Sequence, residues 1–73
     1  MLASEVEVTR ISDQTEFDKQ GLAVTVRQYT FSVGNYGPFY EKFYVGEQDT
    51  PAIERRINNR VAQLRELGVI KGA

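Results

Sequence analysis

The chain has 73 residues, a net charge of −1, and neither cysteine nor histidine. These values predict one domain, residues 1–73, held together by apolar packing and not by disulfides or a structural zinc. No apolar run approaches the roughly 20 residues that cross a bilayer, and the first residues lack the basic and apolar regions of a secretion signal. We therefore expect no membrane association and a cytoplasmic location at synthesis.

The charges are unevenly distributed along the chain. Residues 1–20 carry five acidic and two basic side chains, whereas residues 51–73 carry five basic and two acidic ones. Such a separation favours oriented docking or head-to-tail contact over adhesion to a polyanion.

The first predicted element is a strand over residues 5–11. Polar and apolar side chains alternate there, which places Val6 and Val8 on one face. Ile11 breaks the alternation and is expected at the strand end. Residues 12–21 are polar and finish at Gly21, a pattern typical of a loop. We expect Phe17, the one aromatic residue of this loop, to fold back as an anchor.

Residues 22–33 predict a long second strand whose apolar phase changes midway. The apolar side chains first occupy even and then odd positions: Leu22, Val24, Val26, Tyr29, Phe31 and Val33. Because successive strand residues point to opposite faces, the change indicates either a β-bulge near Arg27 and Gln28 or two halves that bury opposite faces. We favour the bulge.

A third strand is predicted over residues 39–45, and seven of the eight aromatic residues fall between positions 29 and 44. A five-residue loop, 34–38, would place Phe39 opposite Val33 and leave Tyr40, Lys42 and Tyr44 on the outer face. A four-residue loop would instead align Phe31 with Tyr40 and form a mixed aromatic and basic ladder. The sequence leaves both registers open. In the register with the five-residue loop, Phe39, Phe43 and Val45 belong to the core.

A helix is predicted over residues 51–67. Thr50 suits the N-cap and Pro51 the first helical position. An apolar stripe follows at helical spacing, formed by Ile53, Ile57, Val61 and Leu64, with Leu67 at its edge. Gly68 fits the left-handed position after the helix, and Val69 is placed to fold back on Leu64 in a Schellman cap.

These elements predict an α+β fold in the order β-β-β-α, with a three-stranded antiparallel sheet and one C-terminal helix packed on one face. Twelve strand residues extend for about 40 Å, whereas seventeen helical residues span only about 25 Å. We therefore expect part of the long hairpin, from about residue 29 to residue 40, to project. The sheet face opposite the helix is expected to be uncovered.

Catalytic chemistry is not indicated, so we expect a protein that is not an enzyme. The three serines have no recognisable activating partner. The acidic residues Asp13, Glu16 and Asp18 do not match a calcium loop, and residues 34–38 lack the lysine and following helix of a phosphate-binding loop. We predict no catalytic residue, cofactor, metal ion or small-molecule substrate.

The candidate partner-binding residues are aromatic and basic: Tyr36, Tyr40, Lys42, Tyr44, Arg55, Arg56 and Arg60. Tyrosine and arginine are enriched in protein interfaces, which favours a protein partner or self-association. Alternating aromatic and basic residues also suit single-stranded nucleic acid, which we rank lower. The remaining interpretation involves no binding: one face of the sheet is simply exposed to solvent, and the arginines lie along the edge of the core with their charged groups in water.

The run from Tyr29 to Phe39, followed by Phe43 and the helix end at residues 64–68, resembles small proteins of unassigned role encoded by tailed bacteriophages. In these, a strand ending in Val-Gly, a Gly-Pro-Phe turn and a terminal helix recur, often among virion assembly genes. The resemblance spans roughly residues 24–68 and implies a phage-encoded structural protein, such as a virion head or tail accessory or assembly protein. An alternative is an inhibitor of a host protein such as a nuclease or a CRISPR complex.

The order of elements is also similar to that of the DNA-binding domains of some phage and transposon integrases. Those domains read DNA with an arginine-rich sheet. The present strands offer only Arg10, Arg27 and Lys42. A weak nucleic-acid-binding domain is therefore the second alternative.

Overall fold

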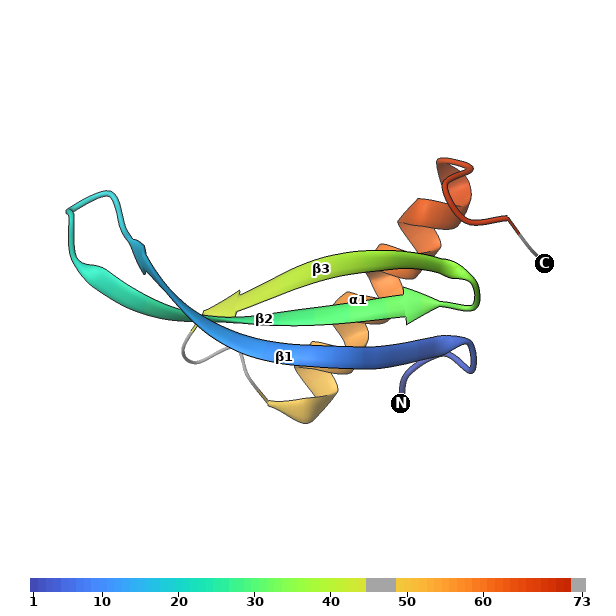
Figure 1. Cartoon of the computed structure of the whole chain (residues 1–73), viewed down its shortest axis with the longest axis horizontal. Coiled ribbons are helices and arrows are strands. Elements are labelled where there is room, and N and C mark those ends of the chain that lie inside the picture. Colours follow the sequence, from blue (N-terminus) through green and yellow to red (C-terminus); the bar gives the residue numbers. More distant parts are fainter. Residues whose placement is uncertain (45–48, 72–73) are drawn as a thin grey trace.

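A computed structural model describes residues 1–44 and 49–71. Its elements are β1 (Val6–Phe17), β2 (Ala23–Val33), β3 (Tyr36–Tyr44) and α1 (Thr50–Glu66). The strands form one antiparallel sheet in the order β1-β2-β3, and α1 lies across one of its faces (Figure 1). The predicted α+β fold is confirmed.

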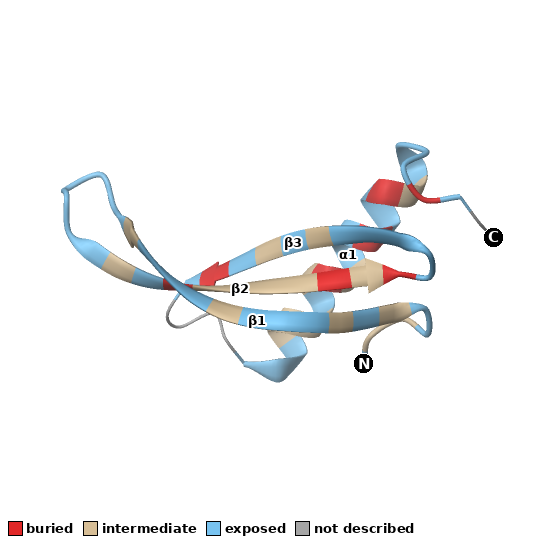
Figure 2. Cartoon of the chain, in the orientation of Figure 1, coloured by how far each residue is buried: buried red, intermediate tan, exposed pale blue. Residues whose placement is uncertain are grey.

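The core lies between the sheet and α1 (Figure 2). It contains seven buried side chains: Phe31 and Val33 of β2, Phe43 of β3, Ile57, Val61 and Leu64 of α1, and Ile70. Tyr29 and Phe39 are partly buried against this cluster. The helical stripe therefore packs as predicted, while Ile70 is a core residue that the sequence did not single out.

β1 is longer than predicted. Residues 12–17, predicted as part of a loop, continue the strand and pair with residues 23–28 of β2. Backbone pairing sustains this polar segment without apolar alternation. The prediction for Phe17 is also wrong, because its side chain is exposed and does not fold back onto the core.

The bulge lies in β1 and not, as predicted, near Arg27 and Gln28. The register shifts between Val8 and Arg10, which leaves Thr9 as the extra residue. The shift puts Ile11 opposite Tyr29 in the middle of β1, so its predicted place at the strand end is wrong. β2 itself is regular, and its phase change arises because Val26 is buried on the face opposite the Phe31 side chain.

The β2–β3 hairpin has a tighter turn than either predicted register. Val33 is paired with Tyr36 across Gly34 and Asn35, and a second register shift, before Phe31 pairs with Phe39, accommodates the extra residue of β3. Both predicted registers are therefore wrong. The predicted faces survive, since moving Phe39 by two residues, from Val33 to Phe31, keeps it on the same side.

A hairpin does project, but it is the β1–β2 hairpin and not residues 29–40. β3 ends at Tyr44, which is paired with Val26. Beyond that pair, residues 15–25 form a two-stranded arm, which extends past the helix at the left of Figure 1. The β2–β3 turn instead adjoins Val33, which is buried in the core.

The helix boundaries are close to the prediction. α1 begins at Thr50, so Asp49 and not Thr50 is the N-cap. At the C-terminal end, Val69 N–H donates to Leu64 O at 2.9 Å, and Gly68 adopts a φ of 77°. The predicted Schellman cap is confirmed. Leu67 is exposed, and Val45, the predicted end of the third strand, lies outside the described residues.

Candidate functional site

The sheet face opposite α1, called the open face below, is built from even-numbered residues of all three strands: 10–14 of β1, 26–30 of β2 and 40–44 of β3. The strand pairing aligns these side chains in rows across the sheet. The rows are Arg10, Thr30 and Tyr40; Ser12, Gln28 and Lys42; and Gln14, Val26 and Tyr44. Each row joins all three strands, so the regular backbone pairing of the sheet sets the spacing of these side chains.

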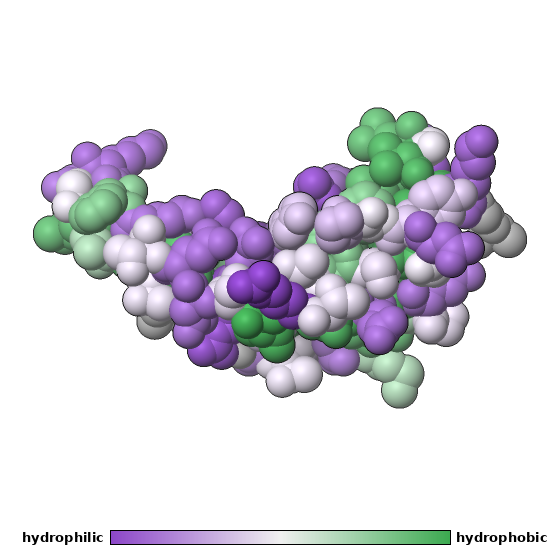
Figure 3. Space-filling view, viewed as in Figure 1, coloured by the Kyte–Doolittle hydropathy of each residue, from purple (hydrophilic) through white to green (hydrophobic). Residues whose placement is uncertain are grey.

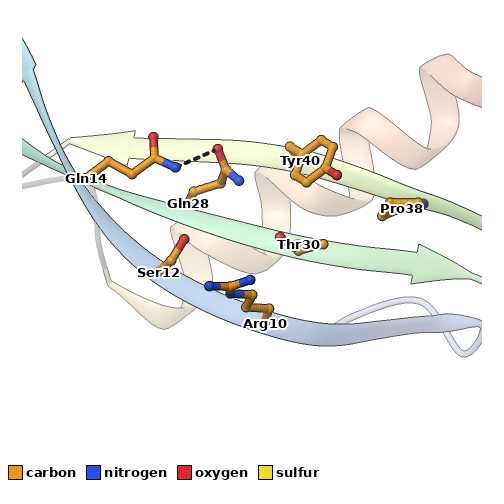
Figure 4. A pocket seen from close by; sticks show the side chains of 7 residues that line it. All are labelled: Arg10, Ser12, Gln14, Gln28, Thr30, Pro38 and Tyr40. Atoms are coloured by element: carbon orange, nitrogen blue, oxygen red, sulfur yellow. Dashed lines mark hydrogen bonds between the residues drawn. The ribbon is translucent and has the colours of Figure 1, made fainter.

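The open face is hollowed at its centre. A concavity of about 280 Å³ is lined by Arg10, Ser12 and Gln14 of β1, Gln28 and Thr30 of β2, and Pro38 and Tyr40 of β3 (Figure 4). Gln14 Nε2 donates to Gln28 Oε1 at 3.3 Å at one end of this concavity (Figure 4). The lining thus combines one cation, one aromatic ring and several neutral hydrogen-bonding groups.

Arg10 is the unpaired cation of the sheet, as far as the described residues show. Arg27 and Lys42, the other strand cations, are paired with Asp13 and Glu16. The bulge at Thr9 is what turns Arg10 to the open face, because in an unbroken strand it would share a face with Val8. Sequence reasoning missed Arg10 as a site residue, and the phase break at Ile11 was the signal that could have found it.

Lys42 is tied to the base of the arm. Its Nζ lies 2.6 Å from Glu16 Oε2, and Tyr44 OH donates to Glu16 Oε1 at 3.5 Å. The hydrogen bond and the negative charge of Glu16 raise the pKa of Lys42 above its ordinary value. The positive charge of Lys42 is therefore compensated by Glu16.

The Asp13 and Arg27 pair lies on the helix side of the sheet. Arg27 Nε donates to Asp13 Oδ1 at 2.8 Å, and its Nη2 lies 3.5 Å from Oδ2. The hydrogen bond from Arg27 and its positive charge hold the pKa of Asp13 below its ordinary value. The same hydrogen bond and the negative charge of Asp13 raise the pKa of Arg27. This ion pair links β1 to β2 at the base of the arm.

The structure divides the predicted partner-binding residues into separate regions. Tyr40 and Tyr44, 53% and 45% exposed, share the open face with Lys42. Tyr36 does not join them, because it is paired with Val33 and so lies on the helix side. The three helix arginines are also on that side of the sheet.

Arg56 packs along the edge of the core, which agrees with the interpretation that the helix arginines border the core and do not bind a partner. Its guanidinium carbon lies 4.4 Å from the centre of the Phe43 ring, and its Nη2 donates to Glu41 Oε1 at 2.8 Å. Such a contact stabilises the helix on the sheet. Arg55 and Arg60 are exposed on α1, away from the open face.

Comparison with known proteins gives no match, whether to a family model, to a curated protein or to a solved structure. Within the described ranges, no helix is long and apolar enough to cross a membrane. No cluster of three or more acidic side chains that could hold a metal ion occurs in residues 1–44 and 49–71. The functional argument therefore rests on the geometry of the open face.

Proposed function

We propose that the protein is a non-enzymatic interaction module that binds a partner protein through the open face. The observation that carries this proposal is the row arrangement, which places Tyr40 across Thr30 from the unpaired Arg10 at one concavity, with Tyr44 two rows further along the same face. Tyrosine and arginine are the residues most often found at the energetic centre of protein interfaces. Serine and amide side chains around them supply adaptable hydrogen bonds.

The open face is also well suited to binding because its backbone is fixed before a partner arrives. Tyr40 and Tyr44 project from a paired strand, and Lys42 is paired with the Glu16 carboxylate. Fixing the backbone in advance reduces the entropy lost on association. A convex loop or helix of a partner, presenting a carboxylate to Arg10, fits this surface best.

A nucleic-acid partner is less well supported. Binding to single strands requires several cations along a groove, whereas Arg27 and Lys42 are already paired with carboxylates. The net charge of −1 also disfavours a polyanion. A mobility shift with single-stranded oligonucleotides, strong at low salt and lost at high salt, would contradict the protein-partner proposal.

The biological setting we propose is a phage virion, as a head or tail accessory or assembly protein, which follows from the resemblance over residues 24–68. Gradient sedimentation of particles from infected cells tests this setting. A virion protein sediments with the particles. Copurification with a host protein and absence from particles would instead favour the inhibitor alternative.

The open face is tested by site-specific photocrosslinking. We expect a p-benzoylphenylalanine at Tyr40 to capture the partner, whereas the same group at Asn59, exposed on α1, captures none. Capture from Asn59 and not from Tyr40 would overturn the assignment of the interface.

Once a partner has been captured, its affinity for substituted proteins can be measured. Tyr40→Ser with Tyr44→Ser is expected to weaken binding by about tenfold or more, because two half-exposed rings are removed from the interface. The control, Arg55→Ser with Arg60→Ser, changes the exposed side of α1 and is expected to leave binding unchanged. Circular dichroism of both variants checks that the fold is retained.

A further inference from the structure

The concavity on the open face is lined by residues of two kinds. Three polar residues, Ser12, Gln28 and Thr30, are half-buried, and the others are exposed: Arg10, Gln14, Pro38 and Tyr40. Within residues 1–44 and 49–71, the hydroxyl groups of Ser12 and Thr30 form no hydrogen bond with another residue. Half-buried polar groups are normally satisfied by a partner or by water. The surface over the strands is mainly hydrophilic on this side (Figure 3), so the concavity suits a polar ligand.

The hydrogen-bonding groups around the concavity are mainly donors. Arg10 carries five N–H donors and no acceptor. Gln28 Oε1 accepts from Gln14 Nε2 at 3.3 Å, which leaves Gln28 Nε2 as a donor at the concavity (Figure 4). No aspartate or glutamate is among the lining residues that the structure describes. The site therefore offers donors and one positive charge to a bound group.

The positive charge of Arg10 is not cancelled by a neighbouring carboxylate, since Arg10 forms no ion pair in the described part of the chain. Of the acidic residues on this side of the sheet, Glu16 is bound to Lys42, whose Nζ lies 2.6 Å from Glu16 Oε2. Glu7 lies opposite Ser32, on the other side of the bulge, and does not line the concavity. The charge of Arg10 is thus available to a ligand.

A carboxylate matches this site better than a phosphate does. The guanidinium of Arg10 carries one charge, and its parallel N–H groups fit the two oxygens of a carboxylate. A phosphate monoester carries about −1.5 to −2 at pH 7, so a second cation would be needed to compensate it. Lys42 does not supply that cation, because it is paired with Glu16 and lies outside the lining.

We propose that the concavity binds one acidic side chain of the partner protein, with the carboxylate held by the Arg10 guanidinium and by Gln28 Nε2. The hydroxyl groups of Ser12 and Thr30 are further donors to the same carboxylate, and the Tyr40 ring lies against its methylene groups. This inference rests on the proposed partner-binding function and identifies the chemical group that the open face selects. The site reads a single negative charge and does not select a phosphorylated residue.

NMR titration of the isolated protein with two blocked tripeptides tests the proposal. The probes are acetyl-Gly-Glu-Gly-amide and acetyl-Gly-Gln-Gly-amide, which differ only in the charged group, at constant ionic strength. We expect the glutamate peptide to shift the Arg10 Nε–H and Gln28 Nε2–H signals until they saturate. The glutamine peptide is expected to leave both signals unchanged. Inorganic phosphate is expected to bind no more tightly than the glutamate peptide.

Substitutions at the concavity give the quantitative expectation. Arg10→Gln is expected to weaken binding of the glutamate peptide by about tenfold, as for the loss of a hydrogen bond to a charged group. Arg10→Lys keeps the charge but loses the parallel donors, so an intermediate affinity is expected. Gln28→Met keeps the length of the side chain without its amide and is expected to weaken binding less than Arg10→Gln. The control, Arg60→Gln, removes the same charge from the exposed side of α1 and leaves binding unchanged.

Four outcomes overturn the carboxylate site: no saturable shift with the glutamate peptide, equal binding of the glutamine peptide, tighter binding of phosphate, or unchanged affinity of Arg10→Gln. Circular dichroism checks that each variant keeps its fold. The titration needs no partner protein, so its failure is distinct from failure of the interface. Crosslinking from Tyr40 without peptide binding removes only the carboxylate site. Peptide binding without any crosslink from Tyr40 contradicts the proposed function, whereas the carboxylate site itself stands.

Discussion

Among the glycines of the β2–β3 hairpin, Gly37 is the one where substitution is expected to be most destabilising. Its φ is 138°, and a Cβ there would lie 3.2 Å from Ser32 Cα and 3.3 Å from Phe31 O. Both the backbone conformation and the space therefore require glycine. Gly34, in the same hairpin, has a φ of 58° and open space around it, so it provides a matched comparison.

We predict that Gly37→Ala lowers the free energy of unfolding by about 2 to 3 kcal/mol, since this region of φ is essentially restricted to glycine. Gly34→Ala is expected to lower it by about 1 kcal/mol, the usual cost of a left-handed alanine. Urea unfolding followed by circular dichroism measures both. Equal losses would show that the close approach to Ser32 is not limiting.

The Asp13 carboxylate makes stability depend on pH at the base of the arm. Because Arg27 holds the pKa of Asp13 below its ordinary value, the pair contributes its full stabilisation at pH values above the pKa that Asp13 has in the unfolded chain. That contribution is lost as the pH falls through the lower folded-state pKa. We predict that Arg27→Gln raises the titration midpoint of Asp13, as measured by NMR of its carboxyl carbon. An unchanged midpoint would mean that the pair is not formed in solution.

Individual arginines show what a sequence can and cannot specify about a site. Helical spacing puts Arg56 beside the apolar stripe, next to Ile57, and such spacing is a local property of the sequence. The face that Arg10 occupies depends on one extra residue, Thr9, opposite Thr30 of another strand. A bulge of this kind is decided by pairing between distant segments, so Arg10 was not identified as a site residue.

At the scale of elements, the segment after α1 contributes more than its length suggests. Ile70 is buried with Ile57, Val61 and Leu64, whereas its neighbour Val69 is half exposed. We predict that Ile70→Ala lowers the free energy of unfolding by about 2 to 4 kcal/mol through the cavity it leaves, and that Ile70→Val costs about 1 kcal/mol.

The control for Ile70 is Val69→Ala, which is expected to change stability by less than about 0.5 kcal/mol, as for most surface substitutions. Thermal unfolding monitored by circular dichroism ranks the three variants. A similar loss for Val69→Ala would contradict the assignment of Ile70 as the residue that closes the core.

The helix was predicted to within a residue at each end because its signals are local: a capping position, Pro51, a 3.6-residue apolar period and Gly68. The sheet faces followed from alternation, which a two-residue register error leaves intact. The arm was missed because residues 12–17 have no buried face. Their strand conformation comes from pairing with residues 23–28, and no composition signal records that pairing.

At the scale of the whole molecule, the open face lies along the long side of an elongated fold. The Cα atoms extend 43 Å along the longest axis but only 22 and 18 Å along the others. The open face covers a side of the sheet and not an end of the molecule (Figures 1 and 3). A compact partner bound there therefore adds to the short dimensions more than to the length.

The position of the open face on the long side makes the proposed interface testable by small-angle X-ray scattering. We predict that the complex with a compact partner is thicker along the short axes and little changed in its longest dimension, because the partner lies against the side of the sheet. Tyr40→Ser with Tyr44→Ser is expected to remove this change, and Arg55→Ser with Arg60→Ser to keep it. A complex that grows mainly along the longest axis would place the partner at an end of the molecule and contradict the assignment to the open face.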